Sequence, residues 1–227
     1  MKAMLENRMK IVVATRTSKA GAAVLLAMLG ACSGVMRDRL PIPIERESAR
    51  AWLEFTDPQA FRWNTGEGDG IASLDLFAPS TYQPPHRSPL AMAIVHGSPV
   101  ENFVLRVKAK QTGREYPHRD LVIVFGYVDP SHFAYAHLAS AADPNAHHLM
   151  LVDGADRRPV TSSRSNGVVW GDAWHDIEVR RTGTHVEVLF DGAGPVLVGE
   201  VPGGPGTVGV GSFDDTGRFR ELVIEPR

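Results

Sequence analysis

The chain has 227 residues, of which 43% are apolar and 22% are charged. This is ordinary usage for a globular protein, and it excludes a disordered, collagen-like or coiled-coil chain. At about 150 residues per domain, the length favours one large domain. The 24 Lys and Arg residues nearly balance the 26 Asp and Glu residues, and no basic block stands out, so nucleic acid is not an expected partner.

The N-terminal segment has the layout of a secretory signal peptide. A basic stretch with Lys10, Arg16 and Lys19 precedes an apolar run over residues 20–29. This run is too short to cross a bilayer, which needs about 20 apolar residues. We therefore predict a signal peptide over residues 1–31.

The only cysteine of the chain, Cys32, follows Leu29, Gly30 and Ala31. These four residues resemble the bacterial lipobox, whose cysteine is diacylated before the peptide ahead of it is removed. The resemblance implies a lipoprotein held to the membrane by its acyl chains, each buried CH₂ contributing about 0.8 kcal/mol. Ser33 stands where the retention signal of the inner membrane would place Asp, which implies the outer membrane of a bacterial cell envelope. A plain signal peptide cut after Ala31 is the alternative.

Residues 32–48, with Pro41 and Pro43, are expected to form an extended, lipid-anchored tether.

From residue 49 to 227 short apolar or alternating runs are broken by Gly, Pro, Asp and Asn, which predicts an all-β domain. In residues 102–110, Phe103, Leu105 and Val107 share one face, as in a half-buried strand. Further strands are predicted at 121–128, 133–138, 149–152, 177–181, 185–190, 207–213 and 219–224. At least eight strands at this spacing predict a two-sheet sandwich. The run 121–128 is apolar on both faces, which predicts a central strand whose second face is covered or lines a groove.

The order of these segments resembles the concanavalin A-like jelly roll of lectins, laminin G-like modules, laminarinase-type glycoside hydrolases and the 3-keto-disaccharide hydrolase domain. The resemblance rests on the segments 125–130, 133–137, 168–175, 186–192 and 209–215. It implies a two-sheet antiparallel sandwich whose concave sheet binds a carbohydrate or related polyol polymer. A glycan-cleaving hydrolase or lyase on the same fold is one alternative, and a laminin G-like module for protein adhesion is another, because this fold hosts many activities.

Candidate catalytic carboxylates are scarce. Laminarinase-type enzymes use Glu-x-Asp-x-x-Glu on one strand, and this pattern is absent. Asp176 and Glu178 share a strand face, but we interpret them as a solvated outer face opposite Ile177. Asp214 and Asp215 are set aside as a catalytic pair, since adjacent strand residues point to opposite faces. The segment 214–217 is interpreted as a hairpin turn.

Five of the nine histidines lie close together in the sequence, between His118 and His148. His137 shares a strand face with Tyr135, and it could lie opposite His147 or His148 across a hairpin. No His-x-His or His-Glu-x-x-His pattern is present, so no metal site is predicted for these residues. The oxygen-rich loop 64–70 could hold a structural calcium ion, although a plain glycine-rich loop is favoured. No other cofactor is expected.

The remaining groove candidates each have a structural alternative. Arg119 and Asp120 are expected to pair where a strand begins, and Arg106 is either a solvated cation or a donor to sugar hydroxyls. Both tryptophans of the segment 168–175 are expected in the core, with stacking on sugar as the alternative. The candidates for the groove are Arg106, His118, Arg119, Tyr135, His137, His147, Trp170 and Trp174.

Overall fold

The computed structural model describes Val12–Val13, residues 52–65 and residues 70–227. The predicted signal peptide and tether lie outside the described residues, apart from Val12–Val13. Within the described part, no helix has the length and the apolar character needed to cross a membrane.

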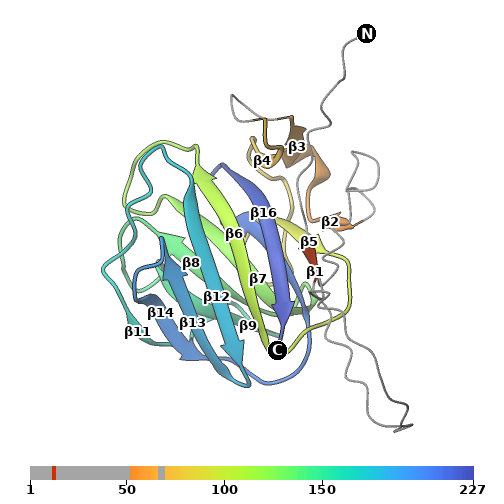
Figure 1. Ribbon diagram of the computed structural model, residues 1–227, viewed down its shortest axis with the longest axis vertical. Helices are drawn as coiled ribbons and strands as arrows, with labels where there is room; N and C mark the ends of the chain where they lie inside the picture. Colours follow the sequence, from red (N-terminus) through yellow and green to blue (C-terminus); the bar gives the residue numbers. More distant parts are fainter. Residues whose placement is uncertain (1–11, 14–51, 66–69) are drawn as a thin grey trace, which may run out of the picture.

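The described chain forms two β-sheets that pack face to face (Figure 1). Among the described strands every pairing is antiparallel except that of β1 with β16. The nine-stranded sheet has the order β11-β14-β13-β12-β6-β16-β4-β3, with β1 beside β16, and the seven-stranded sheet has the order β10-β9-β8-β7-β15-β5-β2. A single 3-10 turn, η1 (Pro58–Ala60), precedes β3.

The strands of the nine-stranded sheet are β1 (Val12–Val13), β3 (Phe61–Asn64), β4 (Ser73–Leu76), β6 (Phe103–Gln111), β11 (Thr161–Arg164), β12 (His175–Thr182), β13 (His185–Phe190), β14 (Pro195–Glu200) and β16 (Gly217–Pro226). The strands of the seven-stranded sheet are β2 (Leu53–Phe55), β5 (Ala91–Val95), β7 (Asp120–Asp129), β8 (His132–Ala139), β9 (His148–Asp153), β10 (Arg158–Pro159) and β15 (Thr207–Ser212). Each strand predicted from the sequence is present, which confirms the all-β sandwich.

Alternation of side chains builds the core between the two sheets. On β12 the apolar residues Ile177 and Val179 point inward and are buried, whereas Asp176 and Arg180 on the other face are exposed. β6 follows the same rule, with Leu105 and Val107 inward. The interpretation of Asp176 as part of a solvated face is therefore confirmed.

The outer face of the seven-stranded sheet is apolar and buried. Strand β7 is the clearest case, because Val122 and Val124 on its outer face are as inaccessible as Leu121 and Ile123 on its inner face. This confirms the prediction for a central strand with a covered second face. The outer face carries Met92, Ile94, Val122, Val124, Phe133, Tyr135, Met150 and Val152, which form a second hydrophobic cluster.

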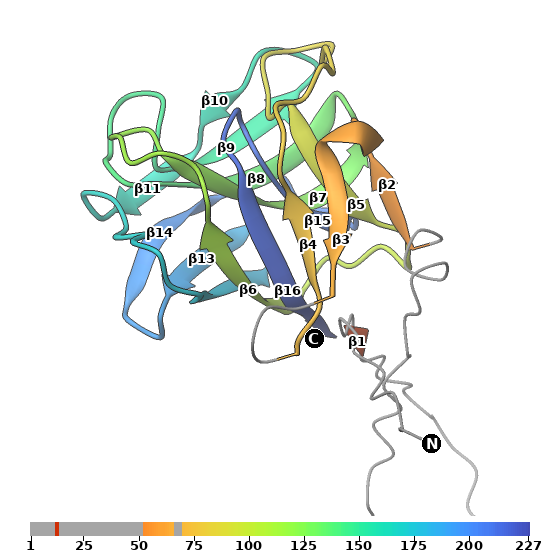
Figure 2. The same cartoon turned by 90° about the horizontal axis from the view of Figure 1, so that it is seen from above.

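Residues 77–90, which we call the strap, close this outer face. Figure 2 shows the strap in yellow, beyond the seven-stranded sheet and away from the nine-stranded one. Near the edge strand β2, Asp57 accepts hydrogen bonds from Thr81 N at 2.7 Å and from Thr81 Oγ1 at 3.0 Å. Near the opposite edge, Arg87 N donates to Asp156 Oδ1 at 2.8 Å. The strap therefore reaches across the sheet.

The strap changes what a ligand can touch on this face. Tyr135 is fully buried, its hydroxyl accepts a hydrogen bond from Arg157 Nη1 at 3.1 Å, and His137 is 3% exposed. A polymer lying on this side would meet the strap instead of these two side chains. This corrects the expectation that Tyr135 and His137 line an open groove.

Candidate functional site

The groove candidates named from the sequence do not form one site. Arg106 lies on the outer face of the nine-stranded sheet, where its guanidinium is 2.6 Å from Glu178 and 3.1 Å from Glu225. Trp170 is a core residue whose Nε1 donates to Leu138 O at 3.2 Å. Trp174 lies just before β12, with the Arg220 guanidinium 4.2 Å from its ring centroid.

Arg119 is buried where β7 begins. Its Nη1 lies 3.1 Å from Glu115 Oε1, and its Nη2 donates to Gln111 O at 3.3 Å and lies 3.9 Å from Asp172. The expected pairing of Arg119 with Asp120 is therefore wrong, because Arg119 has other partners and Asp120 faces a different group of residues.

His147 is also buried, and its backbone has a φ of 59°. Its Nε2 lies 2.9 Å from Ser165 Oγ. Burial lowers the pKa of His147 to about 4, so the ring is neutral at physiological pH. It is His148 that lies directly opposite His137 in the strand register, which settles the two alternatives left by the sequence.

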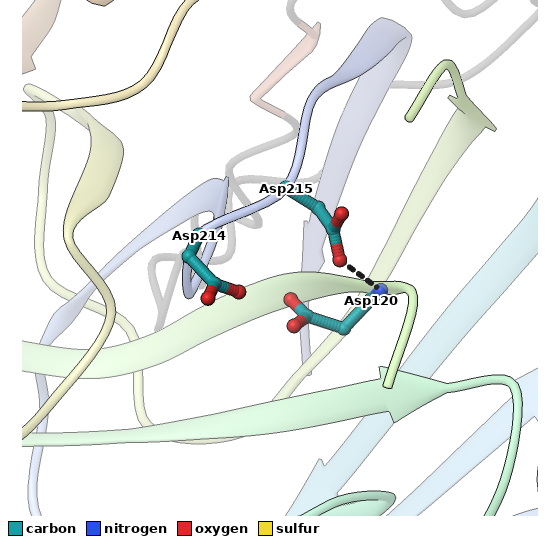
Figure 3. Close-up of side chains that lie close together, drawn as sticks. All are labelled: Asp120, Asp214 and Asp215. Carbon is teal, nitrogen blue, oxygen red and sulfur yellow. Dashed lines mark hydrogen bonds between the residues drawn. The ribbon is translucent and has the colours of Figure 1, made fainter. Parts of the chain in front are cut away.

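Three carboxylates meet at one end of the seven-stranded sheet, and we call Asp120, Asp214 and Asp215 the acidic cluster (Figure 3). One oxygen from each lies within 4.8 Å of the others. Asp120 is the first residue of β7, and the other two belong to the link between β15 and β16. They meet because β15 pairs antiparallel with β7, so that β15 ends where β7 begins.

Hydrogen bonds hold two members of the cluster in place. Asp120 Oδ1 accepts from Ser212 Oγ at 3.0 Å and from Phe213 N at 3.1 Å. Asp215 Oδ2 accepts from Asp120 N at 2.9 Å and from Tyr116 OH at 2.8 Å. Asp214 is exposed and accepts no hydrogen bond within the described chain. The cluster thus has two fixed carboxylates and one that is available to a ligand.

Electrostatics distinguishes this cluster from an ordinary acidic surface. Burial raises the pKa of Asp215 to about 6, against the hydrogen bonds from Asp120 N and Tyr116, and the charges of Asp120 and Asp214 add to the increase. Asp214 is exposed, but the surrounding protein displaces part of the water around its carboxyl group, and this desolvation together with the Asp120 charge raises its pKa as well. Burial and the bond to Asp215 raise the pKa of Tyr116, which therefore stays protonated. Near pH 6, Asp215 is a proton donor as often as an acceptor.

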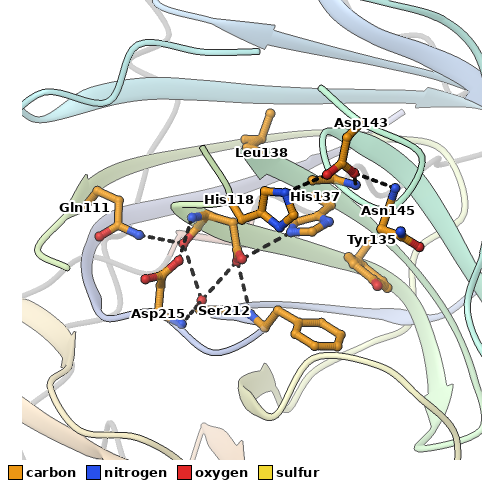
Figure 4. A network of polar contacts seen from close by, with 12 residues as sticks. Gln111, His118, Tyr135, His137, Leu138, Asp143, Asn145, Ser212 and Asp215 are labelled. Carbon is orange, nitrogen blue, oxygen red and sulfur yellow. Dashed lines mark hydrogen bonds and ion pairs between the residues drawn. The ribbon is translucent and has the colours of Figure 1, made fainter. Parts of the chain in front are cut away.

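Two histidines flank the cluster (Figure 4). His137 Nε2 lies 3.2 Å from Asp120 Oδ2, within ion-pair range. The angles do not make this contact a hydrogen bond, and neither ring nitrogen has such a partner in the described chain. His118 is half exposed, with Nε2 2.6 Å from Asp143 Oδ2. We call Tyr116, His118, Asp143 and the acidic cluster together the polar end.

The three carboxylates could hold a metal ion, but their oxygens fit calcium poorly. Asp120 Oδ1 and Asp215 Oδ2 are each committed to two hydrogen bonds. Asp120 and Asp215 each keep one oxygen outside these bonds and Asp214 keeps both, which gives four oxygens, whereas calcium takes about six to eight oxygen ligands. We therefore derive no chemistry from a metal here. The loop proposed for calcium, 64–70, lies outside the described residues at 66–69.

The sequence analysis missed the acidic cluster. It set aside Asp214 and Asp215 because neighbouring strand residues point to opposite faces. In the structure they lie in the link between β15 of the seven-stranded sheet and β16 of the nine-stranded sheet, where that rule does not apply. The hairpin turn predicted for this segment is therefore wrong, because the two strands belong to different sheets and do not pair. Only the pairing of β15 with β7 would have revealed that this link lies over Asp120.

The fold has counterparts among solved structures. The carbohydrate-binding module CBM66 from Bacillus subtilis aligns with a TM-score of 0.54 at 10% identity, covering 76% of this chain and 94% of that one. The likeness shows a shared fold, an all-β jelly-roll sandwich of two antiparallel sheets. A Bacillus subtilis protein of unknown function with a galectin-like fold aligns with a TM-score of 0.46 at 10% identity. The alignment covers 80% of the present chain and 91% of the Bacillus protein. A Parabacteroides distasonis protein, provisionally assigned as a glycosyl hydrolase, aligns with a TM-score of 0.47 at 14% identity. The alignment covers 74% of this chain and 94% of that one.

Sequence comparisons add nothing to this likeness. No protein-family model matches the chain, and no curated protein matches its sequence. Identities this low establish the shared jelly roll alone.

Proposed function

We propose that this jelly roll binds carbohydrate at its polar end. The observation that carries the proposal is the exposed Asp214 carboxylate, which has no hydrogen-bond partner in the described chain. It is close enough to His118 and Tyr116 to interact with both electrostatically. Carboxylates accept hydrogen bonds from sugar hydroxyls, and imidazole and phenol groups can donate or accept them. A ligand at this end would replace the water that now solvates Asp214.

The fold supports the same class of ligand. A carbohydrate-binding module has a jelly roll that covers three quarters of this chain. The strap closes the outer face of the seven-stranded sheet, so a sugar would reach the end of the sheet more readily than its middle. Since the apolar cluster of that face is buried under the strap, it offers no surface for a protein-adhesion role.

Glycan cleavage is a second candidate, and the raised pKa of Asp215 favours it. A carboxyl group with a pKa of about 6 can protonate a leaving glycosidic oxygen near neutral pH. A second carboxylate about 5–5.5 Å away is the arrangement of retaining glycosidases, and the oxygens of the acidic cluster lie within 4.8 Å of one another. Binding remains the primary proposal because hydrogen bonds within the protein already occupy one oxygen of Asp120 and one of Asp215.

We place the protein in the bacterial cell envelope, with acyl chains on Cys32 holding it to the membrane. The support is the lipobox-like sequence that ends at Cys32. In this arrangement the jelly roll stays in water and meets polysaccharides of the envelope or its surroundings.

A glycan array and a reducing-end release assay on the full chain test binding and cleavage together. We expect Asp214→Asn to weaken glycan binding about tenfold, which corresponds to about 1.4 kcal/mol. The control is Asp176→Asn, which removes an exposed carboxylate on the nine-stranded sheet and should leave binding unchanged. Wild-type protein that binds no glycan and releases no reducing ends would contradict both candidate functions.

A further inference from the structure

A pocket of ≈ 260 Å³ opens at the end of the sandwich opposite the polar end. It lies where β7 ends, β8 begins and β12 ends, and we call it the Arg181 pocket. Most of its side chains are apolar, with Arg181, His132 and Asp153 as the charged or titratable exceptions. The lining residues that matter for the argument are Gly126, Val128, Phe133, Arg181, Val201 and Pro205.

Arg181 occupies a position that alternation reserves for an apolar residue. It follows Ile177 and Val179 on the inner face of β12, and only 1% of its surface is exposed. A guanidinium keeps its charge in a protein, and a buried charge without compensation is costly. The fold must therefore provide partners for Arg181.

Those partners are incomplete. Arg181 Nε donates to Gly183 O at 3.0 Å, and Nη2 donates to Pro202 O at 2.8 Å. Within the described chain, Nη1 has no hydrogen bond and the guanidinium has no ion pair with a carboxylate. Glu101 acts on Arg181 only through its charge at longer range, and it does not offset the lowering of the Arg181 pKa by burial.

The absence of a side chain at Gly126 leaves space beside Nη1 of Arg181. Gly126 also lines the pocket, and a Cβ at this position would lie 3.2 Å from Arg181 Nη1. Its φ of 59° favours glycine as well. On the facing loop, Glu101 Oε1 accepts a hydrogen bond from Gly204 N at 2.7 Å, which fixes the wall formed by residues 202–205.

We propose that this pocket binds a small organic carboxylate with an apolar body. The carboxylate pairs with Nη1 of Arg181, because a hydrogen bond between a guanidinium N–H and a carboxylate is assisted by both charges and is stronger than one between neutral groups. The body packs against Val128, Phe133, Val201 and Pro205. A neutral sugar fits this lining poorly, because the pocket offers few polar partners to the sugar hydroxyls. The Arg181 pocket and the polar end are therefore proposed to bind different classes of ligand.

The first test is isothermal titration calorimetry of the full chain with benzoate and hexanoate, each compared with its neutral amide. We expect millimolar binding of the acids and at least about tenfold weaker binding of the amides, because the amides lack the charge that Arg181 pairs with. Equal affinity for acid and amide, or no binding of either acid, would overturn the proposal. Tighter binding of glucuronate than of benzoate would overturn the assignment of an apolar body.

Substitutions locate the site. Arg181→Met should abolish benzoate binding, while Arg180→Met, one residue away on the exposed face, should not. Arg181→Met also removes two hydrogen bonds to backbone carbonyls and can therefore destabilise the fold. A second pair of variants, at an exposed residue of the pocket, avoids this complication. Val128 is 66% exposed at the pocket, so Val128→Glu should repel benzoate and weaken its binding at least about threefold, whereas Val128→Gln should not. Unchanged binding in both Arg181→Met and Val128→Glu would place benzoate elsewhere.

Asp214→Asn should leave benzoate binding intact, which separates this proposal from the one for carbohydrate.

Discussion

Asp215 links the geometry of the polar end to the pH dependence of stability. Its pKa rises from 3.8 to about 6 on folding, so between these values the folded protein keeps a proton that the unfolded chain has released. Stability therefore falls as the pH rises from about 4 to about 6, and it stays lower above that range. The cause is a carboxylate that is half-buried beside two others.

Replacing Asp215 by Asn removes this charge and keeps an oxygen that can accept from Tyr116 and Asp120 N. We expect Asp215→Asn to stabilise the protein by roughly 1 kcal/mol at pH 7.5, after allowance for solvent screening, and to have little effect at pH 4. Thermal or urea unfolding at the two pH values measures the difference. Asp176→Asn, on an exposed and ion-paired residue, is the control and should show no such difference. Destabilisation by Asp215→Asn at pH 7.5 would contradict the assignment of the raised pKa.

Single residues were predictable from the sequence where strand periodicity decides their position. The inward position of Ile177 and the closeness of His137 to His148 follow from alternation and hairpin pairing. Asp120 and Arg181 escaped prediction because their environments depend on contacts between distant segments. Asp120 lies 95 residues from Asp215 in the sequence, and only the order of strands in the sheet brings these residues together.

At the scale of elements, the strap decides which surfaces are open. Asp57 is its main anchor, accepting hydrogen bonds from Thr81 N, Thr81 Oγ1 and Ser80 Oγ at 2.7, 3.0 and 3.3 Å. These bonds also lower the pKa of Asp57, despite the opposing effect of burial. Removing the carboxylate leaves the strap donors unpaired above an apolar sheet face.

We expect Asp57→Ala to cost about 2–3 kcal/mol of folding stability and to loosen the strap. Loosening should expose the apolar cluster that includes Val124 and Met150, which increases the fluorescence of a bound naphthalene sulfonate dye. Limited proteolysis should cut first within residues 77–90. The control is Glu187→Ala, which removes a carboxylate whose closest cation contact is 3.8 Å long. Unchanged dye binding together with unchanged protease sensitivity would mean that the strap does not depend on Asp57.

The strap was not predicted because it has no periodicity. Its sequence is rich in Pro and polar residues, and a sequence of that kind predicts a loop without predicting where the loop lies. The short strands β3, β4 and β14 were also not predicted. On β4 all four residues are buried, so no alternation marks the strand. The longer strands β6, β7 and β12 have clear patterns, and those were sufficient for the fold.

At the scale of the whole molecule, the two proposed sites lie at opposite ends of one sheet. Strand β7 runs from Asp120 in the acidic cluster to Gly126 in the Arg181 pocket, about 20 Å at 3.3 Å per residue. The packed core between the two sheets separates them. A ligand at one end therefore has no direct contact with a ligand at the other.

The proposed lipid anchor on Cys32 would connect the whole jelly roll to a membrane. Between Cys32 and β2, which begins at Leu53, a fully extended chain would reach at most about 75 Å. We expect the wild-type protein to enter the detergent phase in a Triton X-114 partition and to incorporate labelled palmitate. Cys32→Ser should stay in the aqueous phase and remain unlabelled, because it lacks the thiol that receives the diacylglyceryl group. Asp214→Asn should partition like wild type, since the polar end has no part in anchoring. A Cys32→Ser protein that still enters the detergent phase would show that residues other than a lipidated cysteine hold the chain to the membrane.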